Sequence, residues 1–433
     1  MRPPQNCGCV QIDGVDTMSD LELDAESQRR LLLLLPALLT IQRASWEQGC
    51  TAQALLEAHQ SLACLPKNLF LQYLYGFAHD AAVRQADDGR LAAVLNGDGT
   101  TDHGAVDPAC IGETFYYLLG LQDADNQELS QEDAGHFTSS VEAMLSYILD
   151  RCPRAPVSQD HTSPSDVLLS HRMDCVQIWS DAVYMLPPFL ASAAVYYSRR
   201  PNPAYAPARL LSMSLRQIDL AAQALQSPSG LWSHIFDLRT YEFRRRAFWG
   251  VGNGWVCGGI VRVLSTLADA LSDEGNSELH ALVTDAQRAQ LVQSCYRILT
   301  LTLNACLCRL RPDGLFHNIL DDPTTFVETN LSQQLSYTLF RLLDMHSHYP
   351  PRVCKLLRLP ELDEETRAKW ESMAALMHDA ACRKTDRWGF VRDVCGSPRF
   401  DKAGTAAEGQ AWAIAMEVAR YRYLNTKMLA RST

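Results

Sequence analysis

Apolar residues recur at helical spacing along most of the chain. One stripe is separated by steps of three or four positions and consists of Val292, Cys295, Leu299, Leu303, Cys306 and Leu310. A second stripe, Trp370, Met373 and Met377, follows an acidic run at 363–365 that suits a helix N-terminus. Strand-like alternation is rare and short. We therefore predict an all-α fold and exclude the doubly wound α/β folds.

A short segment that recurs indicates how the helices are arranged. Residues 228–234 (PSGLWSH) resemble 312–317 (PDGLFH) and, more weakly, 387–391 (RWGFV). The glycines of these copies are 84 (314 − 230) and 75 (389 − 314) residues apart. That period suits a helical hairpin with long loops. Dividing 433 residues by it gives between five and six hairpins, a number that can close into a ring around a central cavity.

The chain shows no linker that would divide it. We predict a mobile N-terminal arm at 1–24, which is polar and acidic, and a single domain over 25–433. Arg29 and Arg30 precede an apolar run at 31–39, which is too short to cross a membrane. An acidic stretch precedes that run, unlike the start of a signal peptide. We expect a cytoplasmic protein without a membrane partner, with secretion as the minority alternative.

Charge and cysteine content exclude further classes. The 50 acidic residues outnumber the 39 basic ones, which gives a net charge of -11 and argues against a nucleic-acid partner. The 14 cysteines are scattered, so we interpret them as reduced structural residues. The close pairs Cys7/Cys9 and Cys306/Cys308 lack further ligands at zinc spacing, and we predict no metal site.

Two aspartates stand out among aromatic residues and helix breakers. Asp181 lies between Trp179 and Tyr184, and burial there would raise its pKa as a general acid requires. A hydrogen-bonded core aspartate is the alternative. Asp107 precedes Pro108 and a predicted helix, so a helix cap is its simplest interpretation.

Tryptophans and histidines near these aspartates suggest a sugar site. Trp249 and Trp255 flank three glycines, and their flat faces suit sugar rings, although core packing is the alternative. His171 and His234 each follow a loop signal. Either histidine can bind a substrate hydroxyl or carboxylate, or serve a structural role.

Several motifs occur in an order that resembles the unsaturated glycuronyl hydrolases, glycoside hydrolase families 88 and 105, and family 105 more closely. The resemblance covers about residues 41–419. It rests on Trp46-Glu47-Gln48-Gly49, the Asp107–Gly112 segment, Gln177-Ile178-Trp179-Ser180-Asp181, Gly230-Leu231-Trp232-x-His234, Gly252-Asn253-Gly254-Trp255, Glu328-Thr329 and the segment 404–411.

The resemblance implies a fold, a reaction and a site. The fold would be an (α/α)6 barrel of six helical hairpins. The substrate would be a small oligosaccharide left by a polysaccharide lyase, with a 4,5-unsaturated uronic acid at its non-reducing end, and no cofactor or metal is expected. Asp181 would be the general acid/base, and ionised Asp107 would raise its pKa. The pocket would be lined by Trp46, His171, Trp179, His234, Trp249 and Trp255, with His234 near the uronate.

The expected reaction is hydration of a vinyl ether: Asp181 protonates C4, and water then attacks C5. One residue departs from the family motif, because Val251 stands where an arginine is common. Arg244, Arg245 and Arg246 lie nearby. We interpret them as a solvated basic turn, and substitution for the missing arginine is the alternative. The alternatives are another (α/α)6-barrel sugar enzyme, such as an epimerase or an ordinary glycosidase, and a non-catalytic glycan-binding protein. The sequence leaves the oligomeric state open.

Overall fold

The structure is a computed structural model that describes residues 25–62, 67–93, 100–123, 129–158, 166–396 and 399–432. Within these residues, twelve long helices form six hairpins, in which each inner helix packs against an outer helix. Each inner helix packs against the next, and the last packs against the first, so the ring closes. The inner helices are α2 (Ser45–Ser61), α4 (Gly112–Asp123), α7 (Pro187–Ser198), α9 (Gly250–Ser272), α12 (Asn330–His348) and α15 (Ala407–Ser432).

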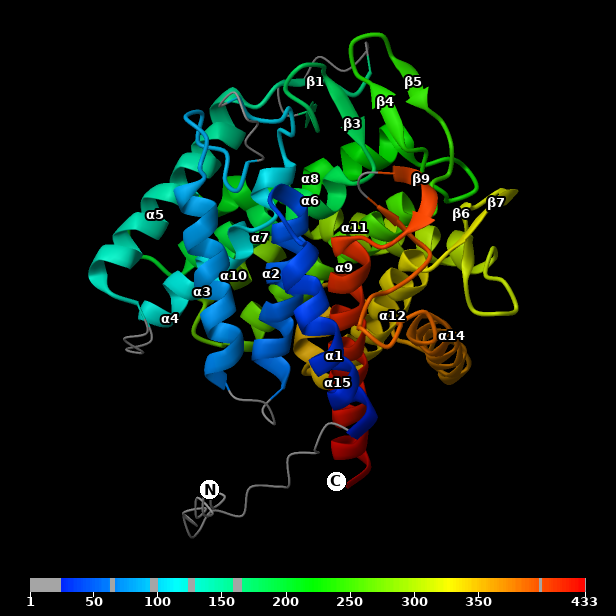
Figure 1. The fold of residues 1–433 in the computed structure, drawn as a ribbon. Coiled ribbons are helices and arrows are strands. Elements are labelled where there is room, and N and C mark those ends of the chain that lie inside the picture. The colour runs from blue at the N-terminus through cyan, green and yellow to red at the C-terminus, as the bar shows by residue number, and fades with distance from the viewer. Residues whose placement is uncertain are drawn as a thin grey trace, which may run out of the picture.

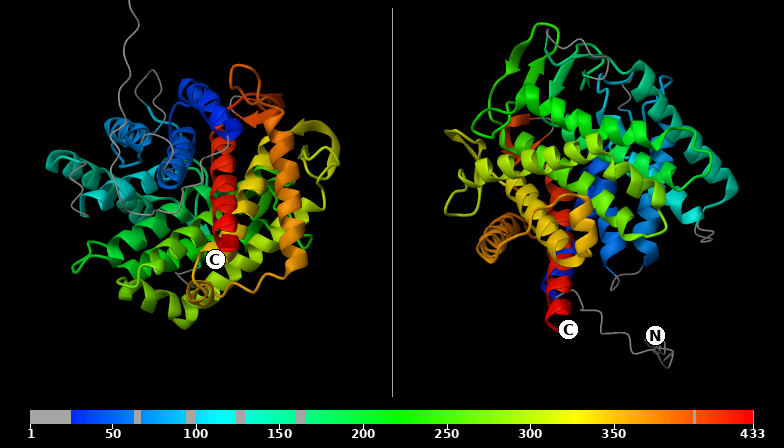
Figure 2. Two further views of the ribbon diagram at one scale, coloured as in Figure 1. Left: turned by 90° about the horizontal axis from the view of Figure 1, so that it is seen from below. Right: turned by 180° about the vertical axis from the view of Figure 1, so that it is seen from behind.

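The outer helices surround this ring and complete the predicted (α/α)6 barrel. Helix α1 packs along α15, so the two ends of the described chain meet in one hairpin (Figures 1 and 2). The residues of the predicted N-terminal arm, 1–24, lie outside the described part of the chain. The outer helices are α1 (Ala25–Ile41), α3 (Lys67–Val83), α5 (Gln131–Ser146), α8 (Pro207–Leu225), α11 (Ala286–Leu307) and α14 (Glu364–Cys382).

Local sequence signals explain where these helices begin and end. Asp363 caps α14 by accepting a hydrogen bond from the backbone N–H of Thr366 at 2.7 Å, and two glutamates occupy the first turn. The apolar stripe of α11 is buried as predicted, including Cys306. Helix α11 ends at Leu307, so Leu310 lies in the turn beyond it.

The three glycines of the sequence repeat occupy equivalent places in the barrel. Gly230, Gly314 and Gly389 follow α8, α11 and α14 and have φ values of +91°, +83° and +87°. That left-handed conformation is strained for any residue with a Cβ. A Cβ at each position would also lie within 3 Å of a carbonyl oxygen on the next outer helix, namely those of Leu301, Leu376 and Leu33.

A fourth copy of this turn is present that the sequence repeat did not reveal. Gly89 follows α3, has a φ of +90° and packs against the carbonyl of Ala143 on α5. The glycine turns therefore join neighbouring outer helices around much of the ring. The sequence repeat therefore identified three of these turns and missed the one at Gly89.

Short strands gather at one end of the barrel, at the top of Figure 1, where the inner helices begin. All pairings are antiparallel. Within the described residues the sheets are β1 (Arg154–Pro156) with β2 (Val167–Leu169), β3 (Gln177–Trp179) with β4 (Ile235–Asp237) and β5 (Glu242–Arg245), β6 (Phe316–Ile319) with β7 (Asp322–Glu328), and β8 (Val394–Gly396) with β9 (Arg399–Gly404).

Three short helices complete the connections: α6 (Ala182–Met185), α10 (Ser277–Thr284) and α13 (Pro351–Leu356). Among the described helices, α9 alone is long and apolar enough to cross a membrane by length and composition. Its side chains are nearly all buried against the other inner helices. Its apolar character is therefore that of a barrel core helix.

Candidate active site

Asp107 lies at the strand-bearing end of the barrel, in a 3₁₀ turn (Asp107–Ala109) just before α4. The turn is buried, and Asp107 Oδ2 lies 3.4 Å from Nε2 of His171. His171 itself is buried at 5% exposure. The side chain therefore faces another functional group rather than serving only as a helix cap.

Asp181 lies between strand β3 and helix α6, at the same end. The antiparallel pairing of β3 with β4 places Trp179 opposite Ile235, which brings His234 next to Asp181. Nε2 of His234 lies 3.4 Å from Oδ2 of Asp181, and the Ser180 hydroxyl donates a hydrogen bond to the same oxygen at 3.0 Å. Each aspartate thus has its own histidine.

Aromatic rings connect the two aspartate–histidine pairs. His171 stacks on Trp179 with ring centroids 4.5 Å apart, and the edge of Trp179 meets His234 at 5.4 Å. His234 in turn contacts Trp249 at 4.6 Å. The structure therefore brings six of the eight predicted site residues into one cluster: Asp107, His171, Trp179, Asp181, His234 and Trp249.

The pKa shifts of the two aspartates differ from those expected from the sequence. Burial, followed by the nearby charge of Asp181, raises the pKa of Asp107 well above its usual value. Burial also acts to raise the pKa of Asp181, but the contacts with His234, His171 and Ser180 outweigh it, and the net pKa is lowered. The raised pKa that we predicted for Asp181 is therefore wrong for the free protein, in which the pKa of Asp107 is the one that is raised.

Trp46 forms a hydrogen bond with a buried glutamate near the site. Its indole N–H donates to Oε1 of Glu408, in the first turn of α15, at 2.5 Å. A Cβ on Gly396 would lie 3.1 Å from the other Glu408 oxygen, and the neighbouring Cys395 accepts a hydrogen bond from the Trp249 indole at 3.3 Å. Trp46 is thus bound to α15, at a position where Glu408 approaches β8, and it is not part of the cluster of six contacting residues.

Comparison with known proteins identifies the family of the chain. Residues 36–355 match the family model described as Glycosyl Hydrolase Family 88. The chain belongs to this family. It is therefore a member of a glycoside hydrolase family.

Individual relatives are distant. The unsaturated rhamnogalacturonyl hydrolase YesR of Bacillus subtilis is 21% identical over 253 residues, which cover 57% of this chain and 60% of that protein, less than two thirds of its length. A structure from Salmonella enterica, described as that of a possible member of the GH105 family, matches with a TM-score of 0.65 and 16% identity, over 95% of this chain and 99% of that one. An unsaturated glucuronyl hydrolase from Bacillus sp. GL1 matches with a TM-score of 0.52 and 13% identity, over 87% and 86%. These structural similarities confirm the fold.

Trp255 of this family 88 hydrolase packs in the barrel interior. It lies six residues beyond Trp249 on α9, or about 9 Å farther along the helix. Its ring contacts Tyr184 at 4.8 Å and Trp412 at 5.5 Å. Tyr337 also contacts Trp412, at 5.2 Å. These rings form an aromatic layer beneath the site, so the packing role that the sequence left open for Trp255 is the one the structure displays.

Arg245 lies at the site, as the alternative interpretation of the basic run allowed. Its guanidinium donates to Nδ1 of His234 at 3.1 Å and lies 5.8 Å from the Trp249 ring centroid. Arg244 instead pairs with an aspartate on β4, and Arg246 lies over Phe243. The basic run is therefore not simply a solvated turn. Recognition of strand β5 would have separated these arginines, because successive side chains on a strand point in opposite directions.

One group of side chains in the described part of the chain has the composition of a metal site. His378, Cys382 and Glu417 offer ligand atoms within 4.8 Å of one another, on α14 and α15. The Arg30 guanidinium also contacts Glu417 and His378, and it supplies positive charge at the position where a cation would bind. The group is therefore explained as a structural ion-pair network, and it does not include the residues of the Asp107–Asp181 cluster.

Proposed function

We propose that this glycoside hydrolase removes a 4,5-unsaturated uronic acid from the non-reducing end of lyase-generated oligosaccharides, as an unsaturated rhamnogalacturonyl hydrolase does. The observation that carries the proposal is the pair of buried carboxyl groups, Asp107 and Asp181, whose environments move their pKa values in opposite directions. Pairs of this kind divide acid and base roles at a single pH. The aromatic rings around them suit the flat faces of a sugar.

The proposed reaction begins at carbon. Transfer of one proton from the enzyme to C4 of the C4=C5 vinyl ether leaves an oxocarbenium ion at C5. Water attacks C5 and gives its own proton to the carboxylate, which restores the enzyme. The resulting hemiketal opens, and the glycosidic bond breaks to release the next sugar. This course differs from ordinary glycoside hydrolysis, in which the acid protonates the glycosidic oxygen.

We assign proton transfer to Asp181 and storage of the proton to Asp107. The two carboxyl groups interact, so the pair is best described as sharing one proton, and the raised pKa of Asp107 favours Asp107 as its holder in the free protein. Binding of substrate displaces water and brings an additional carboxylate, and both effects raise the pKa of Asp181. Asp181 then carries the proton at the moment that C4 requires it.

His234 and Arg245 are proposed to receive the uronate. The Arg245 guanidinium lies beside His234 and the Trp249 face, so it offers a positive charge next to an aromatic surface. A guanidinium binds a carboxylate through two parallel hydrogen bonds. Arg245 thereby supplies the charge that the family motif places at the position of Val251.

The test is incubation of the purified protein with lyase products of rhamnogalacturonan, arabinogalactan, ulvan and glycosaminoglycan. The expected result is loss of the ultraviolet absorbance of the conjugated uronate, fastest with rhamnogalacturonan products. Asp181→Asn is expected to abolish this loss. Asp174→Asn is the matched control, because Asp174 is 40% exposed and pairs with Arg172 on the loop beside His171.

Other outcomes would support a different function. Release of a saturated sugar while the absorbance persists would indicate an ordinary glycosidase. Conversion of a sugar without bond cleavage would indicate an epimerase. Tight binding of unsaturated disaccharides with no turnover would indicate a non-catalytic glycan-binding protein. Full activity of Asp181→Asn would remove Asp181 from the proposed role.

A further inference from the structure

A cavity of about 850 Å³ opens at the end of the barrel opposite the aspartate pair. The site residues precede or begin the inner helices, whereas most of the cavity lining comes from later residues of the same helices, including Gln60 on α2 and Asp269 on α9. Glu113, in the first turn of α4, lies at the inner end of the cavity. Arg262, at the cavity, lies 13 residues beyond Trp249 along α9, which corresponds to a rise of about 20 Å along the helix axis. The aromatic layer that contains Trp255 and Trp412 lies between them along the barrel. The cavity is therefore distinct from the catalytic cluster.

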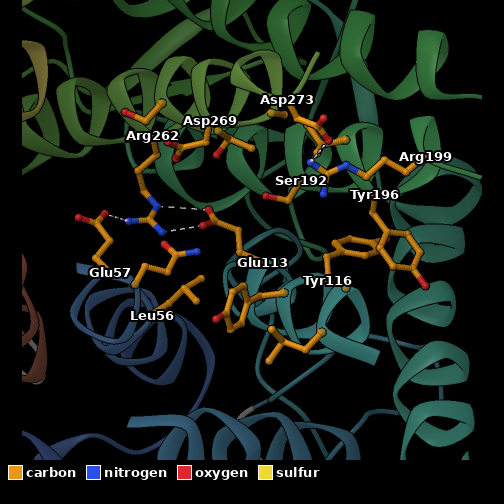
Figure 3. Close-up of a pocket in the computed structure, with 18 of the residues that line it drawn as sticks. Leu56, Glu57, Glu113, Tyr116, Ser192, Tyr196, Arg199, Arg262, Asp269 and Asp273 are labelled. Atoms are coloured by element: carbon orange, nitrogen blue, oxygen red, sulfur yellow. Dashed lines mark hydrogen bonds and ion pairs between the residues drawn. The ribbon is translucent and has the colours of Figure 1, made fainter. Parts of the chain in front are cut away.

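The floor of the cavity is a buried ionic cluster. Arg262 lies between Glu57 and Glu113 and forms an ion pair with each of them, as Figure 3 shows. The three side chains are exposed by only 7%, 9% and 5%. Tyr337 donates a hydrogen bond to Glu57, and Gln53 donates one to Glu113. Removing such charges from bulk water is costly, so this arrangement does not serve core packing alone.

Two charged side chains at this cavity keep unused hydrogen-bonding atoms. Among the described residues, Oε2 of Glu57 and Nε of Arg341 are buried and have no hydrogen-bond partner. Both residues line the cavity, and they are 7% and 4% exposed. An unsatisfied buried polar atom is costly to the folded protein. One atom accepts and the other donates, so a molecule rich in hydroxyl groups satisfies both.

The charge on the cavity wall indicates a neutral ligand. The described side chains that line it include four carboxylates and four guanidinium groups, and their charges cancel. At the mouth, Arg199 pairs with Asp273 at 3.6 Å (Figure 3). Tyr116 and Tyr196 add aromatic surface on the same side. A wall of this kind favours a ligand with hydroxyl groups and an apolar ring face, and it offers no net attraction to an ion.

We propose that this cavity is a second saccharide-binding site, for a neutral mono- or disaccharide, at the opposite end of the barrel from the catalytic cluster. The sugar hydroxyls donate to Glu57 and accept from Arg341, and the ring lies against the tyrosines. The site is independent of the proposed reaction. It therefore remains testable if the unsaturated substrate proves wrong.

Saturation-transfer NMR tests the proposal on the full chain with four probes. Methyl rhamnoside and methyl galactoside are neutral, galacturonate is anionic and glucosamine is cationic. The blocking variant is Gly120→Leu, because Gly120 lines the cavity and a Cβ there meets open space, which lets the side chain fill the cavity without a clash. Gly76→Leu on α3 is the matched control, since its Cβ also meets open space and Gly76 does not line the cavity.

The wild-type protein and Gly76→Leu are expected to bind the neutral glycosides, and Gly120→Leu is expected to lose at least tenfold in affinity. Circular dichroism and the thermal midpoint report whether both variants fold. Arg199→Gln removes one positive charge at the half-exposed mouth and is expected to shift preference toward glucosamine. Three outcomes would each overturn the proposal. The neutral probes bind equally to the wild type and to folded Gly120→Leu, the wild type prefers a charged probe, or the neutral probes do not bind at all.

Discussion

Nε2 of His234 lies 3.4 Å from Oδ2 of Asp181, and the opposite ring nitrogen accepts a hydrogen bond from Arg245. A guanidinium can only donate, so Nδ1 must be the acceptor, and a neutral ring then carries its proton on Nε2, facing Asp181. Arg245 therefore sets the orientation in which His234 lowers the pKa of Asp181. The arrangement connects a residue on strand β5 to the protonation of the proposed catalytic acid.

The two aspartates are expected to respond differently to replacement by asparagine. Asp181→Asn should be inactive at every pH. Asp107→Asn should lose most activity at neutral pH, because Asp181 then lacks the shared proton and its own pKa is lowered. Lowering the pH protonates Asp181, so the residual activity of Asp107→Asn should rise toward acid pH. Measurement of kcat/KM against pH by the ultraviolet assay checks both statements. Recovery at acid pH in Asp181→Asn, and none in Asp107→Asn, would reverse the roles.

Replacement of Arg245 by methionine is expected to weaken binding of the uronate. A hydrogen bond to a charged group contributes about 1.5–3 kcal/mol, so KM should rise by about tenfold to a hundredfold. The value of kcat should change less, and Arg245→Lys should recover part of the loss because it keeps the charge. Arg246→Met is the control, since Arg246 lies over Phe243 and is expected to leave KM within about twofold. Unchanged kinetics in Arg245→Met would exclude it from the site.

The helical barrel was predictable because its signals are local and repeated. The apolar stripe of α11 marks the face that packs against the barrel. The glycine turns at Gly230, Gly314 and Gly389 each pack against the next outer helix, and this contact recurs around the ring. Gly89 was missed because its turn reads Asp-Asp-Gly-Arg-Leu and lacks the aromatic residue that marked the other copies. The backbone requires only glycine at that position, so the aromatic residue was the less general part of the pattern.

The glycine turns are expected to contribute strongly to stability. Gly314→Ala forces a Cβ into a left-handed conformation and toward the carbonyl of Leu376, at a cost of at least about 1–2 kcal/mol. The measured effect is a lower midpoint of thermal and denaturant unfolding. Gly76→Ala is the matched control, because Gly76 is in helix α3 with open space around its Cβ. Alanine there should stabilise the protein by about 0.5–1 kcal/mol.

The residues of the site were predictable, but their protonation was not. Asp181, His234 and Trp249 stood out because of their chemical types and their surroundings in sequence. The direction of a pKa shift depends on which side chains face each other. His234 faces Asp181 only because β4 pairs with β3, across 53 residues of sequence (234 − 181). Arg245 joins them through β5, a strand that the sequence pattern did not reveal.

Glu408 is expected to make the stability of the protein depend on pH. Burial and the charge of Glu47 raise its pKa from 4.5 to about 7, although the Trp46 indole N–H acts in the opposite direction. The folded protein then holds a proton that the unfolded chain releases above its ordinary pKa. The free energy of unfolding should therefore fall as the pH rises from about 4.5 to about 7 and level off above that range. Denaturant unfolding at a series of pH values measures this slope.

The variant Glu408→Gln isolates this contribution. Glutamine does not titrate, and its side-chain oxygen still accepts the hydrogen bond from Trp46, so the decline in stability between pH 4.5 and 7 should become shallower. Part of the slope should remain, because burial also raises the pKa of Glu328 to about 7. Glu364→Gln on the surface of α14, with a side chain 89% exposed, should follow the wild-type curve. An unchanged slope in Glu408→Gln would mean that Glu408 is ionised in the folded protein at neutral pH, with Trp46 bound to its carboxylate.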